Sequence, residues 1–440
     1  MPGLKQPGPT GPARTVGYGL PVSSLALSRM KSDPALVAKA VLWPLAILTL
    51  LQRLIILVPN GNKTDDFTTV YAAAVRFLRH EAVYTENYDT VDPHYLYPPS
   101  GTLVMAPFGY FDPETARYLF VGFSTIALLA ALYIMLRMFG YGLNSVLAPV
   151  VLFFAVATEA VTSTLVFSNF NCFVLLAEVA AMALLLKRKD LWAGVPLGLS
   201  FAVKPLLFVM LLLIIVNRQW KAMIAAVGIP VVLMAGGMLL SADRTEFFHK
   251  TLPYLSEARD YYNSSIAGNA QYFGLPTWLD LFLRAAIVVM AAVTLWLLWR
   301  YYRTSNELLW LATSTGTLLT TSWLVLSLGQ GYYSMLLFPM LMTVVYRSSV
   351  LGNWASWVAV YGFLSYDNWL SGKWPAFGRS LAYLKCTLGW SLLIIVPFCV
   401  LLFRYLDARA ENRLDEGIDR PLHPDEEPGR RELAQSTARG

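Results

Sequence analysis

The chain has 440 residues, of which 56% are hydrophobic and only 14% are charged, and its mean hydropathy is +0.51. An ordinary soluble domain has about 25% charged residues. This composition therefore excludes a soluble protein and predicts an all-α polytopic membrane protein. The net charge is +6, but Lys and Arg form small clusters between apolar segments, which is typical of orientation signals and argues against nucleic-acid binding.

The first residues and the first apolar run set the orientation. Residues 1–34 are rich in proline and carry positive charge, so we expect a disordered cytoplasmic tail. The run 35–58 is long enough to span a bilayer and starts too late for a cleaved signal peptide. Residues 60–115 then form a first external segment, which begins with Asp65 and Asp66.

Two further features lie in the first external segment. Apolar residues recur at helical spacing over 67–80, which predicts an amphipathic helix at the membrane surface. The proline-rich stretch 92–99 predicts a stiff loop, and it carries His94, Tyr95 and Tyr97, whose rings suit contact with a sugar.

The next spans are expected at 116–138, 143–166 and 170–187, and the last ends in a basic cluster that indicates the cytoplasmic side. The apolar run 191–216 also ends in basic residues and has Lys204-Pro205 at its midpoint, so we predict a hairpin of two short helices. Each arm would rise about 20 Å, less than the roughly 30 Å of a bilayer core, which holds Lys204 inside the outer leaflet.

The rest of the chain continues the same pattern. Residues 222–240 cross outward to a second external segment, 241–276. Later spans are expected at 277–299, 307–328, 333–346, 353–370 and 383–405. The prediction is therefore one membrane domain, 35–406, a bundle of about twelve membrane segments with both termini inside. The polar residues 407–440 predict a disordered cytoplasmic tail.

The adjacent carboxylates of Asp65 and Asp66 are the strongest chemical signal. A carboxylate at this place is able to act as a general base on an acceptor hydroxyl, whereas the alternative is that the residues only cap the following helix. A divalent metal held by both remains open, but two carboxylates without a third ligand are a weak metal signal and we expect no cofactor. Cys172, Cys386 and Cys399 lie in apolar segments and predict neither a disulfide nor a metal site.

Lys204 is the second signal, because a lysine far from either end of an apolar run needs an anionic partner. A lipid phosphate suits it; the alternative is a proline kink with a lysine whose side chain reaches the interface. Arg259, in the second external segment, is a second candidate contact for a phosphate or sugar.

Several polar residues near the outer ends of spans are candidate contacts for the sugar or the acceptor. The alternative for the tyrosines is an interfacial aromatic belt. These candidates are Glu159, Asn169, Asn171, Asn263, Gln330, Tyr332 and Tyr333.

Four sequence strings carry a resemblance to a known family. They are TDDF at 64–67, VDPHYLYPP at 91–99, YFGLPTW at 272–278 and QGYYSM at 330–335. Together with the Lys-Pro hairpin, they resemble the integral-membrane glycosyltransferases of the GT-C class that use polyprenyl-phosphate sugars, and among them the branching arabinofuranosyltransferases of mycobacterial cell walls. The resemblance extends over about residues 40–415.

The resemblance implies a GT-C bundle in the plasma membrane with an external active site. It also implies inverting transfer of D-arabinofuranose from decaprenyl-phosphate-arabinofuranose to the 3-hydroxyl of an α-(1→5) arabinan, which makes branches in arabinogalactan and lipoarabinomannan. Asp66 would be the base. Two alternatives stay open: a mannosyltransferase with a polyprenyl-phosphate-mannose donor, and a transporter or flippase of a polyprenyl-linked sugar. The transporter alternative is less favoured, because the sequence has no second Lys-Pro-type interruption in a matching half, as an inverted repeat would lead one to expect.

Overall fold

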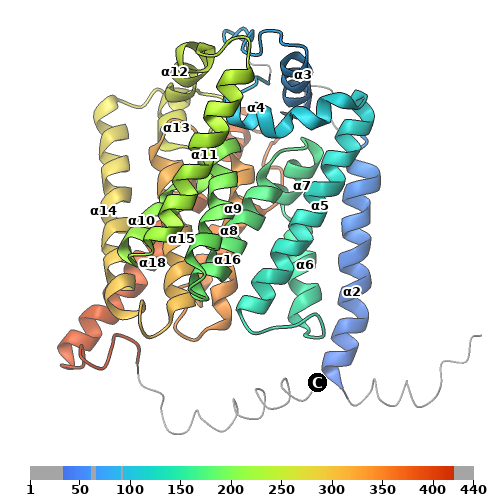
Figure 1. Cartoon of the computed structure of the whole chain (residues 1–440). Helices are drawn as coiled ribbons and strands as arrows, with labels where there is room; N and C mark the ends of the chain where they lie inside the picture. The colour runs from blue at the N-terminus through green and yellow to red at the C-terminus, as the bar shows by residue number, and fades with distance from the viewer. Residues whose placement is uncertain (1–32, 61–65, 91–92, 421–440) are drawn as a thin grey trace, which may run out of the picture.

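The computed structural model describes residues 33–60, 66–90 and 93–420, and within these residues every regular element is a helix or a helical turn. Figure 1 shows one bundle of roughly aligned helices. Short helices, among them α3, α4 and α12, lie at one end, called here the upper end, while α2 begins and α18 ends at the opposite, lower end. The prediction of an all-α membrane protein is confirmed.

The upper end is built from short helices and helical turns, and sequence periodicity predicted only some of them. They are α3 (Asp66–Leu78), α4 (Pro99–Met105), η2 (Ala106–Tyr110), η4 (Phe247–Thr251), α12 (Leu252–Ser256) and α13 (Ile266–Phe273). The apolar face of α3, including Phe67 and Phe77, is buried in a cluster that also takes in Tyr84 and Tyr95. The amphipathic pattern over 67–80 therefore serves protein packing at the upper end.

The first half of the bundle begins with α2, whose N-terminus is capped by Asp33: its carboxylate accepts the N–H of Ala35 at 2.9 Å. Its elements are α2 (Pro34–Gln52), η1 (Arg53–Leu57), α5 (Pro113–Met138), α6 (Leu147–Ala157), α7 (Glu159–Val166), α8 (Asn171–Leu186), α9 (Asp190–Val203), η3 (Pro205–Val209), α10 (Met210–Val216) and α11 (Trp220–Leu240).

The second half completes the core, in which Trp310 and Trp390 are almost fully buried. Its elements are α14 (Thr277–Tyr301), α15 (Glu307–Val325), η5 (Gly331–Leu337), α16 (Phe338–Met342), η6 (Thr343–Val345), α17 (Trp354–Leu364) and α18 (Pro375–Ala410).

Five of the described helices are long and apolar enough to cross a membrane, and six are if the bent pair α6 and α7 counts as one span. The pair bends by 61° at Thr158, whose backbone is extended and whose hydroxyl caps α7. The other apolar helices, among them α8, α9 and α17, are too short to cross alone. The span expected over 353–370 ends at Leu364, because a polar loop follows.

The chain reverses direction at Lys204, the position where the sequence analysis expected a turn. The backbone of Lys204 is extended, with φ −146° and ψ 101°, because the following Pro205 disfavours a helical conformation there. At the other end of the segment, Gln219 Nε2 donates a hydrogen bond of 2.7 Å to Asp190 Oδ1. The start of α9 and the end of α10 therefore lie together at one side of the bundle.

The prediction of a disordered tail from residue 407 is wrong for its first part. Helix α18 continues to Ala410, and residues up to Arg420 are held by ion pairs, including Arg413 with Asp407 at 3.1 Å and Arg404 with Asp419 at 3.0 Å. From composition alone we expected these charged side chains to be solvated, whereas in the structure they form ion pairs with each other and with charged residues of α18. Residues 1–32 and 421–440 lie outside the described residues.

Close packing of α9 against α11 positions the Lys204 turn. A Cβ added to Gly194 would lie 2.2 Å from the carbonyl oxygen of Ala222, and one added to Gly198 would lie 2.8 Å from that of Ala225. Two helices that approach this closely need residues without side chains at the contact.

The first prediction compares two glycines in this helix pair. Gly194→Ala should lower the midpoint of thermal unfolding in detergent, because the methyl group forces α9 away from α11 at a cost of roughly 1–3 kcal/mol. Gly228→Ala is the matched control, since nothing lies within 4 Å of its added Cβ. Equal unfolding midpoints for the two variants would contradict the packing.

Candidate active site

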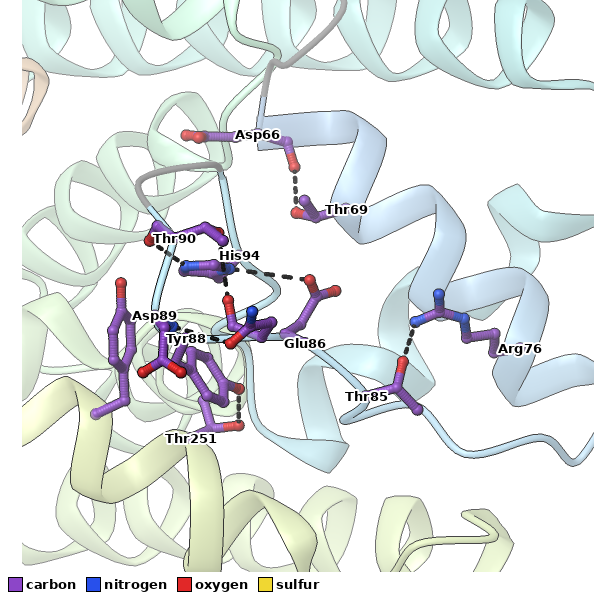
Figure 2. Close-up of polar contacts among 12 residues, drawn as sticks. Asp66, Thr69, Arg76, Thr85, Glu86, Tyr88, Asp89, Thr90, His94 and Thr251 are labelled. Carbon is purple, nitrogen blue, oxygen red and sulfur yellow. Dashed lines mark hydrogen bonds and ion pairs between the residues drawn. The ribbon is translucent and has the colours of Figure 1, made fainter.

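Asp66 lies at the N-terminus of α3, at the upper end of the bundle. The backbone N–H of the next residue, Phe67, donates to the carbonyl of Phe167 at 3.3 Å, which ties the start of α3 to the end of α7. The Thr69 hydroxyl donates to the Asp66 carbonyl at 3.0 Å (Figure 2). The partial positive charge of a helix N-terminus makes this a favourable position for a carboxylate.

Asn169 connects this carboxylate to Lys204, which is partly buried. Its Nδ2 donates to Asp66 Oδ2 at 2.5 Å, and its Oδ1 accepts a hydrogen bond from Lys204 Nζ at 3.0 Å. The amide has only one orientation that satisfies both neighbours, because a carboxylate only accepts and an ammonium only donates. Asn169 is 2% exposed, whereas Asp66 and Lys204 on either side of it are partly buried.

Lys204 has further partners from two other segments. Its Nζ donates to Asn171 Oδ1 at 3.0 Å and lies 5.2 Å and 4.8 Å from the ring centroids of Tyr332 and Tyr333. Two asparagine oxygens and two aromatic faces thus stabilise the cation. An ammonium group has three N–H donors, and the hydrogen bonds to Asn169 and Asn171 use two of them.

Gln330, Tyr332 and Tyr333 complete the arrangement. The Tyr332 hydroxyl donates to Gln330 Oε1 and lies 3.5 Å from Asp66 Oδ2. Tyr333 is buried and lies next to both Trp323 and Lys204. Out of the residues selected from the sequence, the structure therefore brings together seven: Asp66, Asn169, Asn171, Lys204, Gln330, Tyr332 and Tyr333.

Tyr95 and Tyr97, two residues apart, have different environments. Burial of its hydroxyl and then the charge of Asp66 raise the pKa of Tyr97, so Tyr97 lies near Asp66 and stays a neutral phenol at neutral pH. Burial also raises the pKa of Tyr95, which is 0% exposed and shares a 2.7 Å hydrogen bond with Thr102. Tyr97 is the one placed beside the carboxylate, while Tyr95 supports the loop from within the apolar cluster.

His94 and Arg259 form a second group at the upper end. Figure 2 shows His94 directed toward its own loop, with Nε2 3.1 Å from the Thr90 carbonyl and Nδ1 3.9 Å from Glu86. Its ring packs edge-on against Tyr254, 5.3 Å between centroids. Arg259 donates to the Tyr254 hydroxyl at 2.5 Å and lies 4.4 Å above the same ring. Tyr254 thus joins the two residues, which touch neither Asp66 nor Lys204 in the contacts found among the described residues.

Two sequence candidates have structural partners instead. Glu159 begins α7 and pairs with Lys385 at 3.5 Å, with half of its side chain exposed. Asn263 donates to the carbonyls of Arg259 and Ser327 and accepts the N–H groups of Ser265 and Gly329. All four hydrogen-bonding positions of the Asn263 amide are used, so it holds the loop together and has none left for a sugar.

Asp65 belongs to residues 61–65, which lie outside the described residues. A catalytic role for Asp65 beside Asp66 therefore stays a prediction. In the part of the chain that the structure describes, no three His, Cys, Asp or Glu side chains are grouped so that they could hold a metal ion. The groups nearest Asp66 are the amide of Asn169, the phenol of Tyr332 and, across the amide, the amine of Lys204.

Sequence reasoning missed the residues that anchor the site from outside it. The Ser100 hydroxyl donates to the carbonyl of Ala202 at 2.5 Å, which fastens α4 two residues before Lys204. The Phe167 carbonyl fastens α3 in the same way. Neither of these two hydrogen bonds is recognisable in the sequence, because the acceptor is a backbone carbonyl and every residue has one.

Comparison with known proteins adds independent information. A model of glycosyltransferase family 87 matches residues 95–327, more than half of the chain. The chain belongs to glycosyltransferase family 87. It is therefore a glycosyltransferase, and Lys204 together with the loop at Tyr97 lies within the matched region.

Relatives of this glycosyltransferase cover nearly its whole length. An α-(1→3)-arabinofuranosyltransferase of Mycobacterium tuberculosis (strain H37Rv) is 52% identical over 92% of this chain and 95% of its own. Proteins with the same name from Mycolicibacterium smegmatis and Corynebacterium glutamicum are 51% and 40% identical, over 88% and 85% of this chain and 91% and 90% of their own. No solved structure matches the chain significantly.

The second prediction concerns the bridge. Asn169→Ala should lower kcat for glycosyl transfer about 100-fold, because Asp66 and Lys204 lose the group that sets their spacing. The Michaelis constant for the donor should change much less. Asn144→Ala, at an exposed loop position, is the control and should leave kcat unchanged. A folded Asn169→Ala variant with kcat within twofold of the parent would show that the bridge does not position the site.

Proposed function

We propose that the chain is an α-(1→3)-arabinofuranosyltransferase. It transfers D-arabinofuranose from decaprenyl-phosphate-arabinofuranose to the 3-hydroxyl of an α-(1→5) arabinan and so makes branches in arabinogalactan and lipoarabinomannan. The relatives of that name support the sugar and the linkage. The observation that carries the chemistry is the Asp66–Asn169–Lys204 bridge, which puts a carboxylate and a cation one amide apart.

Asp66 is the proposed general base. In a single displacement the acceptor oxygen forms a bond to the anomeric carbon while the bond from that carbon to the phosphate oxygen breaks. The acceptor proton passes to the Asp66 carboxylate, which needs to lie within hydrogen-bond reach of the hydroxyl. The hydrogen bond from Asn169 holds one carboxylate oxygen, Oδ2, which leaves Oδ1 for the acceptor.

Lys204 is the proposed partner of the departing phosphate. The electron pair of the broken bond goes to the decaprenyl phosphate, whose added negative charge the ammonium stabilises. Lys204 retains one N–H beyond the two donated to asparagines. Because Lys204 supplies this positive charge, the proposed reaction needs no divalent metal.

The placement in the membrane is part of the proposal. Basic residues lie where helices end at the lower end, among them Arg137, Lys189, Lys221 and Arg300. These basic residues support, by the positive-inside rule, the proposal that the lower end faces the cytoplasm and that Asp66 lies outside the plasma membrane. If short and broken helices such as α8, α9 and α10 count as membrane segments, the bundle has about twelve.

The third prediction tests the base. Asp66→Asn should abolish transfer to a linear α-(1→5) oligoarabinoside, because the amide has no basic oxygen to take the proton, while donor binding and folding persist. Membranes or purified protein would be incubated with labelled decaprenyl-phosphate-arabinose and the branched product separated. Branched product formed by the variant would refute the role of Asp66.

The same assay tests the sugar when the wild-type protein receives polyprenyl-phosphate-mannose instead. The proposal expects transfer of arabinose and none of mannose. Transfer of mannose at a comparable rate would replace the proposal with a mannosyltransferase and would leave the roles of Asp66 and Lys204 intact.

The fourth prediction tests the phosphate partner. Lys204→Gln should raise the Michaelis constant for the donor and lower kcat, together by about 10²–10³-fold in kcat/KM, and should leave the Michaelis constant for the acceptor nearly unchanged. Lys204→Arg should recover part of the loss because it restores the charge. Equal effects on donor and acceptor, or no effect, would contradict the role.

A further inference from the structure

A cavity of about 610 Å³ lies at the lower end of the Lys204 hairpin, far from Asp66. Four cationic side chains line it: Arg188 and Lys189 before α9, and Arg218 and Lys221 around the start of α11. Helix α9 has 14 residues, from Asp190 in the cavity wall to Val203 beside Lys204, a rise of roughly 20 Å. The cavity is thus separate from the site described above.

The charge balance of the cavity is positive. Asp190 also lines it, with one carboxylate oxygen bonded to Gln219, and Arg188 pairs with Glu307 at 2.9 Å. For Lys189, Arg218 and Lys221 no ion pair is found among the described residues. These three cations, set against the single Asp190 carboxylate, leave the cavity with a net charge of +2, which makes it available to an anion.

Two helix N-termini reinforce the cations. Arg188 and Arg218 both adopt φ 56°, the left-handed conformation that ends α8 and α10 in the same manner. Helices α9 and α11 then start side by side and run in the same direction, since Gly194 lies against Ala222 and Gly198 against Ala225. The first N–H groups of both helices lack intrahelical partners and carry partial positive charge at this end.

Two tryptophans identify the kind of anion. Trp192 and Trp220 line the cavity and are 66% and 55% exposed. Tryptophan is enriched where a membrane protein meets the headgroup layer of a bilayer. An anion bound between these rings and the cations would therefore belong to a lipid more readily than to a dissolved metabolite.

We propose that this cavity binds the phosphate of an anionic phospholipid headgroup. Basic cavities between membrane helices suit such headgroups, and the volume is in the range of ordinary ligand pockets, roughly 300–1,000 Å³. The bound lipid fixes the base of the hairpin at one headgroup layer. Because the hairpin is shorter than the bilayer, this also sets the depth at which Lys204 lies.

Native mass spectrometry of the full-length protein tests the proposal. The protein, released from detergent micelles, is titrated with phosphatidylglycerol or with phosphatidylcholine of the same acyl chains. We expect one phosphatidylglycerol to be retained in preference to phosphatidylcholine. The double variant Arg218→Gln/Lys221→Gln should bind it about 30-fold more weakly, at roughly fivefold for each removed charge.

The control is Arg300→Gln/Arg409→Gln, which removes two exposed charges near helix ends outside the cavity. It should retain phosphatidylglycerol as the parent does. Equal loss in both double variants would show a diffuse charge effect and overturn the site, as would equal retention of the two lipids. Displacement of the lipid by millimolar inorganic phosphate would identify a site for a soluble anion and overturn the lipid assignment. Circular dichroism confirms that each variant is folded.

Discussion

The hydrogen bonds on the two sides of the Asn169 amide are the interaction on which the site depends. They join a carboxylate at the start of α3 to a lysine at the break between α9 and η3, segments that are more than 130 residues apart in the chain. A charge buried without a partner is costly. Each charge here is stabilised through a shared neutral group, so neither is cancelled by direct contact with the other.

This arrangement needs a helix that ends inside the bundle. Pro205 stops α9 at Lys204, and the extended backbone there lets the side chain leave the helix axis. The glycine contacts with α11 then hold α9 close to its neighbour, and the Ser100 bond fastens its last turn to α4. The geometry of the Asp66–Asn169–Lys204 bridge is thus supported by packing along the length of α9.

Much of the architecture follows from local signals in the sequence. Composition identified a membrane protein, helical periodicity located α3 to within two residues, and Lys204-Pro205 located the turn. The length of α18 and the ordered residues 407–420 were missed, because ion pairs such as Arg404 with Asp419 fold the segment back against its own helix. A count of charges does not reveal which of them will pair.

For the site, the sequence by itself determined the chemical types: a carboxylate after the first span, a lysine in an apolar run and amides near the ends of helices. Only the tertiary structure decided which of them meet. It joined Asp66, Asn169 and Lys204, and it assigned Asn263 to loop closure and His94 to a separate aromatic group. The reason is physical: residue type fixes what a side chain can donate or accept, whereas its partner depends on contacts between segments remote in sequence.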